Sequence, residues 1–206
     1  MAIGNSRNNK LAAIYRVSSR SFPDRQVIQI GETIAIIPKE GFTKDIYRNP
    51  YITYNCLRIT PRYAVVANGI QTDPIIEKLV GGMDPRDAVT SVLFGLDYEH
   101  DQFNTPRIAA VIDLQTRLGT LGTVRKDALL VRSFKIKEGE AYYVATYQHD
   151  TPGEQFKDIN LDITSAGEGC DYILGKGVFE SLELPISAAC ALENGAGFEI
   201  AHQNLK

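Results

Sequence analysis

Short, largely apolar runs in the first part of the chain predict β-strands. The stretches with this pattern are rich in Val, Ile, Tyr and Thr, which favours strands over helices. They cover residues 11–18, 27–38, 52–60 and 64–68. The segment Thr60-Pro61-Arg62 has the composition of a tight turn. We therefore expect the last two of these strands to form a hairpin.

The period changes after residue 70. A helix is predicted over residues 72–80, because Pro74 suits a first turn and Gly81-Gly82 suits a helix end. Asp84-Pro85 opens a second helix. Its apolar residues recur on one face at helical spacing; they are Ala88, Val89, Val92, Leu93 and Leu96. The two adjoining helices are expected to form one layer.

Strands are predicted again over residues 107–114, 118–124, 128–136 and 141–148, separated by turns that suit antiparallel pairing. A looser segment, 148–169, leads to helices expected near 170–174 and 186–192, and to a last strand near 197–201. Helices thus appear twice between blocks of strands. This order fits two antiparallel sheets packed face to face with a helical layer outside each, although the pattern alone also allows a simpler two-layer fold.

Composition narrows the class of protein. With 206 residues, 44% of them hydrophobic, we expect residues 1–206 to form a single domain around one sizeable core. The net charge of -3 argues against a nucleic-acid or membrane-surface partner. No apolar run approaches the roughly 20 residues of a membrane helix, and no signal-peptide core is evident, so we expect a cytoplasmic location. The three cysteines, Cys56, Cys170 and Cys190, are far apart, which predicts reduced, buried thiols.

The segment Tyr15–Arg25 runs from a predicted strand into a loop. It holds three arginines and three serines: Arg16, Arg20, Arg25, Ser18, Ser19 and Ser21. Forked guanidinium groups backed by hydroxyl donors suit the binding of a phosphate or a carboxylate. A solvated basic turn would have the same composition. This segment alone leaves both interpretations open.

Glu99 and Tyr54 are further candidates. If the second helix continues, Glu99 lies three residues beyond Leu96 on the buried face. Burial and the negative end of the helix dipole would then raise its pKa and make it a better proton acceptor. If the helix ends by Tyr98, Glu99 is instead a surface acid. Tyr54 lies in a predicted strand with Ile52 on its own face and Thr53 and Asn55 on the other. Taken alone, this position indicates that Tyr54 packs in the core.

Three segments together resemble one family, the archaeal-type IMP cyclohydrolases. They are residues 15–25, residues 48–56 (RNPYITYNC) and residues 97–110 (DYEHDQFNTPRIAA), supported by Val66-Ala67-Asn68-Gly69. The resemblance runs from about Leu11 to the C-terminus and is looser after Leu114. It implies ring closure of 5-formamidoimidazole-4-carboxamide ribonucleotide to inosine monophosphate (IMP) and water, a step of de novo purine biosynthesis. It also implies a four-layer αββα sandwich, an α+β fold similar to that of the N-terminal-nucleophile hydrolases.

The resemblance implies a site as well. Its catalytic residues would be Arg25, Tyr54 and Glu99, and its substrate-binding candidates are Ser19, Arg20, Arg48, Asn68, Asn104 and Arg107. We hypothesise that Glu99, or a water that it orients, takes the amide proton, Arg25 stabilises charge on the formyl oxygen and Tyr54 protonates that oxygen. The sequence also allows the reverse assignment, with Tyr54 as the base and Glu99 as the acid. The expected partner is a purine ribonucleotide, no metal or organic cofactor is required, and a homo-oligomer is expected.

Two alternatives stay open. An amide hydrolase of this fold class would use an N-terminal Cys, Ser or Thr, whereas the chain begins Met1-Ala2 and would need cleavage before Ser6. A nucleotide-binding homologue would keep the anion site without the chemistry. The sequence also departs from the family at its start, where a full strand with a Gly-Arg pair is expected. Residues 1–9 instead predict a loop or a shortened strand, either because the strand is trimmed or because the start codon lies upstream.

Overall fold

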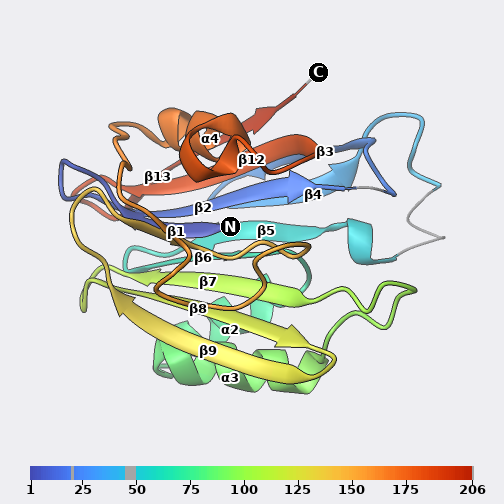
Figure 1. The fold of residues 1–206 in the computed structure, drawn as a ribbon, viewed down its shortest axis with the longest axis horizontal. Coiled ribbons are helices and arrows are strands. Elements are labelled where there is room, and N and C mark those ends of the chain that lie inside the picture. Colours follow the sequence, from blue (N-terminus) through green and yellow to red (C-terminus); the bar gives the residue numbers. More distant parts are fainter. Residues whose placement is uncertain (20, 45–49, 206) are drawn as a thin grey trace.

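Two antiparallel sheets lie face to face with helices on their outer faces (Figure 1). The computed structural model describes residues 1–19, 21–44 and 50–205. Within these residues, sheet A has the strand order β11-β10-β1-β2-β12-β13 and sheet B the order β3-β4-β5-β6-β7-β8-β9. Helix α4 covers sheet A, and α2 and α3 cover sheet B. The predicted layers are therefore confirmed, while the closer likeness to N-terminal-nucleophile hydrolases stays a prediction.

The elements have the following bounds. Sheet A contains β1 (Ala2–Asn5), β2 (Leu11–Ser18), β10 (Ala141–Tyr143), β11 (Lys157–Asp158), β12 (Pro185–Glu193) and β13 (Phe198–Asn204). Sheet B contains β3 (Arg25–Ile30), β4 (Thr33–Pro38), β5 (Tyr54–Ile59), β6 (Tyr63–Ala67), β7 (Arg107–Asp113), β8 (Leu118–Arg125) and β9 (Ala128–Lys135). Among the described residues, the α-helices are α2 (Thr72–Val80), α3 (Pro85–Leu96) and α4 (Ala166–Gly175), and the 3-10 helices are η1 (Pro50–Ile52) and η2 (Gly177–Phe179).

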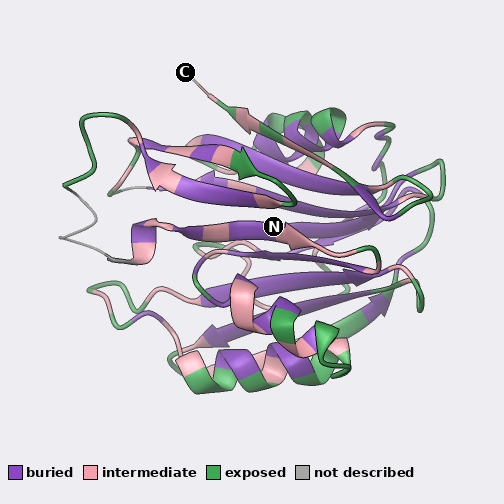
Figure 2. Cartoon of the chain, turned by 180° about the vertical axis from the view of Figure 1, so that it is seen from behind, coloured by how far each residue is buried: buried purple, intermediate pink, exposed green. Residues whose placement is uncertain are grey.

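Strand alternation places the core in three layers. In β2, Leu11, Ala13 and Tyr15 face the other sheet, whereas Ala12 and Ile14 face α4. A third cluster joins sheet B to α2 and α3. Figure 2 shows that the central strands are mostly buried along their whole length. Both faces of each sheet are therefore covered, which explains the many fully apolar strands.

The predicted second helix is confirmed in its start and its buried face. The Asp84 carboxylate accepts a hydrogen bond from the Arg86 backbone N–H, and Pro85 occupies the first turn. Ala88, Val89 and Leu93 are fully buried against sheet B. The capping interaction and the apolar stripe thus fix where α3 begins and which way it faces.

Three predicted elements differ from the structure. The strand predicted over residues 141–148 is limited to Ala141–Tyr143, and a turn follows. Residues 186–192, predicted as a helix, lie in strand β12, which is buried on both faces and therefore lacks an alternating pattern. Residues 27–38 form two strands joined by a turn at Gly31, whose φ of +59° suits glycine. The start of the chain is the shortened strand that the sequence allowed, because β1 pairs with both β2 and β10.

The edges of the two sheets are linked by a side chain. The Asn204 amide in β13 donates to the Val27 carbonyl at 3.0 Å and accepts from the Val27 N–H at 2.8 Å. Asn204 thereby satisfies both backbone groups of a residue in β3, as a paired strand would. This contact holds β3, and with it Arg25, close to sheet A.

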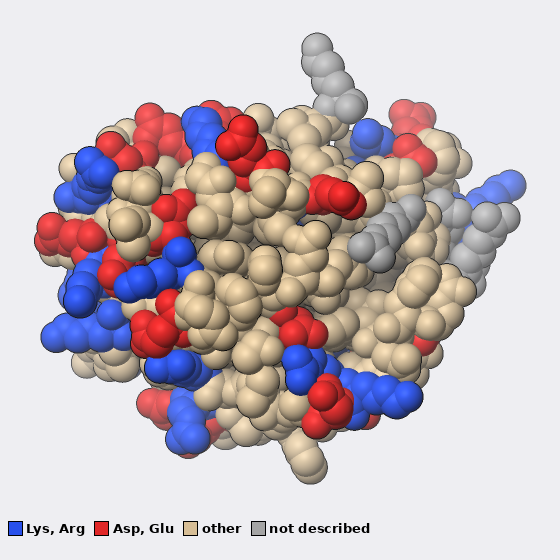
Figure 3. All heavy atoms as spheres, in the orientation of Figure 1, with Lys and Arg blue, Asp and Glu red and all other residues tan. Residues whose placement is uncertain are grey.

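All three cysteines are free and buried, as predicted. None of the helices in the described residues is both long and apolar enough to cross a membrane. On the face drawn in Figure 3, basic and acidic side chains are interspersed around a broad uncharged area.

Gly122 in β8 lies directly under α3. A Cβ at this position would collide with the side chains of Val89 and Leu93. We expect Gly122→Ala to lower the free energy of unfolding by about 1–3 kcal/mol, because the helix must shift. Gly95→Ala is the control, since a Cβ there meets open space within α3 and should stabilise the helix by about 0.5–1 kcal/mol. Urea denaturation measures both, and shifts in the same direction would contradict this account.

Candidate active site

A cavity of about 920 Å³ lies where the two sheets meet the loops at one end of the sandwich. These loops, which include residues 97–106, are at the right edge of Figure 1. Tyr15 of sheet A and Tyr54 of sheet B both line the cavity. The cavity therefore depends on how the sheets are stacked.

The segment after β2 folds around the backbone of Phe22. The Ser19 hydroxyl accepts a hydrogen bond from the Phe22 N–H at 2.9 Å, and the Arg25 Nε donates to the Phe22 carbonyl at 3.1 Å. Ser19 and Arg25 are both buried and both line the cavity. At these two positions, the solvated-turn interpretation is wrong. Arg20 lies outside the described residues.

Arg16 has a different environment from Arg25. Its guanidinium donates to the backbone carbonyls of Ile173, Phe179 and Glu183 and to the Ser18 hydroxyl. These contacts tie β2 to the segment around η2. Arg16 borders the cavity, but its nitrogens are already used to hold the structure together.

Glu99 enters the cavity from a loop. Helix α3 ends at Leu96, and Asp97 adopts a positive φ of +57° with an extended ψ of −178°. The chain then folds back, and the Glu99 N–H donates to the Thr105 carbonyl at 2.9 Å. The continued helix considered from the sequence is therefore wrong, yet Glu99 is only 7% exposed.

Asp101 organises this loop. Its carboxylate accepts hydrogen bonds from the backbone N–H groups of Phe103 and Thr105 and from the Thr105 hydroxyl. Its carbonyl also accepts from the Asn104 N–H, and Asn104 has a left-handed φ of +49°. A short acidic side chain thus shapes the turn that brings Asn104 to the cavity wall.

The surroundings of Glu99 raise the pKa of its carboxyl group. Burial raises the pKa of the Glu99 carboxyl to about 7, and the nearby Arg107 and Arg25 charges oppose this shift only in part. Asp101 raises the pKa further. At neutral pH both the charged and the neutral forms of Glu99 are therefore populated, which suits a residue that takes and returns a proton.

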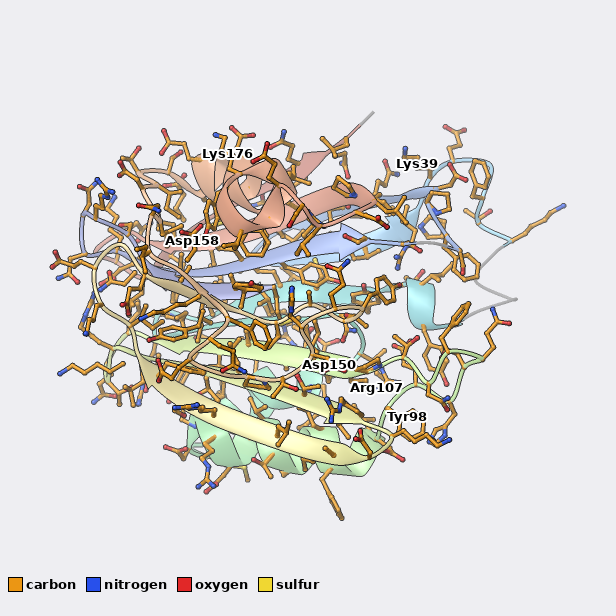
Figure 4. All side chains as sticks on the ribbon, viewed as in Figure 1. Lys39, Tyr98, Arg107, Asp150, Asp158 and Lys176 are labelled. Carbon is orange, nitrogen blue, oxygen red and sulfur yellow. The ribbon has the colours of Figure 1, made fainter. Side chains whose placement is uncertain are left out.

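Arg107 lies behind Glu99. Its Nη1 is 3.2 Å from the Glu99 carboxylate and 3.4 Å from Gln71 Oε1, and the side chain is 4% exposed. Within the described chain, Arg107 is not among the residues that line the cavity. In Figure 4, Arg107, Tyr98 and Asp150 are labelled at the same end of the sandwich as the loop after α3. This position suits support of Glu99 better than contact with a substrate.

Asn68 joins the same network. Its amide nitrogen donates to the Pro106 carbonyl and its oxygen accepts from the Ile108 N–H and from Gln71 Nε2. Gln71 also donates to the Ile108 carbonyl. Asn68 lines the cavity, but these bonds mainly fix the start of β7 beside the loop that carries Glu99.

Tyr54 completes the group of predicted catalytic residues. It is 8% exposed, lines the cavity and has its hydroxyl 2.8 Å from that of Tyr15. Burial raises the pKa of Tyr54, whereas the Arg25 charge lowers it. The Glu99 charge also raises the pKa of Tyr54. The structure thus brings Arg25, Tyr54 and Glu99 into one electrostatically coupled site.

Arg48 lies outside the described residues. Three residues that shape the site were not among the candidates from the sequence: Tyr15, Gln71 and Asp101. Only Tyr15 had a visible signal, because strand alternation places it on the same face as Ala13 and Val17.

The described residues contain no group of three or more His, Cys, Asp or Glu side chains placed to hold a metal ion.

Comparisons with known proteins all point to the same family. Residues 1–197 match the model of a family described as "IMP cyclohydrolase-like protein". The chain belongs to this family. Relatives of the IMP cyclohydrolase-like family include proteins named IMP cyclohydrolase from three archaea. The chain is 40% identical to that of Methanosphaera stadtmanae (99% of this chain, 96% of the relative), 41% to that of Methanocella arvoryzae (96% and 92%) and 39% to that of Methanocaldococcus jannaschii (98% and 95%).

The raised pKa of Glu99 predicts a pH-dependent cost of folding. A carboxyl with a pKa of about 7 when folded, and 4.5 ordinarily, binds more protons in the folded state between these values. Wild-type stability should therefore fall as pH rises through this window. Glu99→Gln removes this term, so its stability relative to wild type should rise by about 1–3 kcal/mol between pH 5 and pH 8. Urea denaturation at both pH values measures this difference, with Glu77→Gln on the exposed face of α2 as control.

Proposed function

We propose that this chain, residues 1–206 as one domain, is an IMP cyclohydrolase. It would convert 5-formamidoimidazole-4-carboxamide ribonucleotide to IMP and water in purine biosynthesis. The observation that carries the proposal is the meeting of buried Arg25, Tyr54 and Glu99 in one cavity of about 920 Å³. This volume lies within the range of pockets that take small organic ligands, roughly 300–1,000 Å³. The names of the archaeal relatives support the same activity.

The first chemical step joins the carboxamide nitrogen to the formyl carbon. The amide lone pair is delocalised, so the nitrogen needs a base as it attacks. Ionised Glu99, with a pKa of about 7, would take one amide proton. The Tyr54 hydroxyl, kept protonated by its raised pKa, would protonate the formyl oxygen. The cationic Arg25 would stabilise negative charge developing on that oxygen.

The second step expels water and restores both residues. Neutral Glu99 would return its proton to the new hydroxyl group, which leaves as water. The former formamide nitrogen would lose its proton to the Tyr54 phenolate as the ring double bond forms. The cycle therefore balances without a further proton donor. Because both reacting groups belong to one substrate, binding the formamide in the reactive rotamer would supply a large part of the acceleration.

The substrate-binding predictions separate into three groups. Ser19 and Asn104 line the cavity and stay proposed contacts to the ribonucleotide. Asn68 and Arg107 are engaged with protein groups, so we propose that they position the loop and Glu99, respectively. Arg20 and Arg48 remain candidates for the phosphate from the resemblance alone. The homo-oligomer and the cytoplasmic location also stay predictions.

The alternatives predict different products. An amide hydrolase would release a free acid or amine from an amide, and a nucleotide-binding homologue would bind IMP without turnover. The ionic groups around Tyr54 favour an enzyme over a binding protein, because a binding site does not require a carboxyl poised near neutral pH.

Activity can be tested on the purified chain. Wild type should convert the formamido ribonucleotide to IMP, followed by ultraviolet absorbance. Glu99→Gln and Arg25→Ala should each lower kcat by about 100-fold or more, because each removes a group that acts in the transition state. Arg86→Ala, exposed in α3, and Glu77→Gln are matched controls that should keep wild-type turnover. A folded wild type without turnover would refute the enzyme assignment.

The pH profile separates the possible roles of Glu99. If Glu99 is the base, activity should rise with pH through about 7, where the carboxyl ionises. Arg107→Met removes the adjacent positive charge, so the pKa of Glu99 should rise and this limb should move to higher pH. Arg132→Met, on the exposed edge strand β9, is the control. Activity that falls with pH through this region would assign Glu99 the acid role instead.

A further inference from the structure

Tyr15 and Tyr54 face each other across the two sheets. Tyr15 lies in β2 of sheet A and Tyr54 begins β5 of sheet B, and their hydroxyl oxygens are 2.8 Å apart. The side chains are 3% and 8% exposed, and both border the cavity. This is a direct hydrogen bond between a proposed catalytic residue and a residue to which the proposed reaction gives no role.

Only one of the two hydroxyl groups donates in this bond. Tyr15 is 3% exposed, and Tyr54 is the hydrogen-bond partner that the described residues give its hydroxyl, so a Tyr15 proton has the Tyr54 oxygen as its acceptor. Tyr54 lines the cavity together with Arg25 and Glu99, so its own proton can be directed to a molecule bound there. The Arg25 charge lowers the pKa of Tyr54, although burial and Glu99 raise it. The positions of the two residues favour Tyr15 as donor and Tyr54 as acceptor.

The direction of the bond decides where the Tyr54 proton points. If Tyr54 accepts from Tyr15, its own O–H is directed away from Tyr15 and is available to a molecule in the cavity. Tyr15 is well held for this purpose, because β2 pairs along its length with β12, where Tyr15 lies opposite Ala189. The donor is thus fixed by a central strand before any ligand binds.

We propose that Tyr15 is a positioning residue that donates a hydrogen bond to Tyr54 and directs the Tyr54 proton toward the formyl oxygen. This inference rests on the proposed function. As the amide nitrogen bonds to the formyl carbon, the Tyr54 proton moves to the formyl oxygen. The Tyr15 hydrogen bond then stabilises the Tyr54 phenolate until the former formamide nitrogen returns a proton to it.

A double-mutant cycle tests the proposal. The variants are Tyr15→Phe, Tyr54→Phe and the double variant, and the measured quantities are kcat and KM for ring closure. Tyr15→Phe should lower kcat by about 10-fold with little change in KM, as expected for one hydrogen bond to a developing charge. Tyr54→Phe should lower kcat by about 100-fold or more. The double variant should match Tyr54→Phe alone, because Tyr15 acts only through Tyr54.

Other outcomes overturn the proposal. If Tyr15→Phe keeps wild-type kcat, or lowers kcat by the same factor whether Tyr54 is present or not, Tyr15 has no positioning role. Tyr63→Phe is the control for losing a buried tyrosine hydroxyl, because Tyr63 faces α2 and α3 on the opposite side of sheet B. It should keep wild-type kcat.

A measurement without turnover separates this proposal from the proposed function. In protein labelled with ¹³C at tyrosine Cζ, the Tyr54 resonance is the one lost in Tyr54→Phe. Tyr15→Phe should shift that resonance, and an unchanged resonance would refute the hydrogen bond. If the shift occurs but wild type has no turnover, the cyclohydrolase assignment fails and the catalytic role of Tyr15 fails with it. Wild-type turnover without the shift overturns the Tyr15 proposal alone.

Discussion

The structure depends on the contact between the two sheets. Alternate residues of β2 and β12 pack against strands of sheet B, and this apolar layer sets the separation of the sheets. At one end the layer gives way to polar side chains, where the Tyr15 and Tyr54 hydroxyls meet at 2.8 Å. The cavity is therefore the open end of the inter-sheet core. Any change in the stacking would separate groups that belong to different sheets.

Burying Glu99 has a cost that its surroundings offset only in part. A carboxylate that is 7% exposed loses most of its hydration, and one arginine contact at 3.2 Å does not fully replace it. The carboxyl is left with a pKa of about 7. A stronger ion pair would stabilise the fold more but would hold Glu99 permanently ionised. Incomplete compensation is thus what gives the group its capacity to exchange protons near neutral pH.

The sequence predicted most of the strands because they are rich in β-branched and aromatic residues and are bounded by turns, and it predicted helices α2 and α3 from their start and end signals and, in α3, an apolar stripe. It failed for residues 186–192, where a strand buried on both faces shows only a run of small apolar residues. The catalytic group was predicted from the family resemblance. The burial of Glu99 was anticipated for the wrong reason, since a loop shaped by Asp101 buries it. Long-range contacts such as that of Arg107 with Gln71 leave no periodic trace.

Strand order has a consequence for biosynthesis of the molecule. Tyr15 and Arg25 lie near the beginning of the chain. However, β2 pairs with β12, and the Val27 N–H donates to Asn204, so both depend on residues near the end of the chain. A ribosome must therefore release nearly all of the polypeptide before these early residues acquire their final surroundings. Until then, β2 and β3 each present an unpaired edge to solvent and to other nascent chains. The interval between translation of the first and last strands is the period when this protein most needs protection from aggregation.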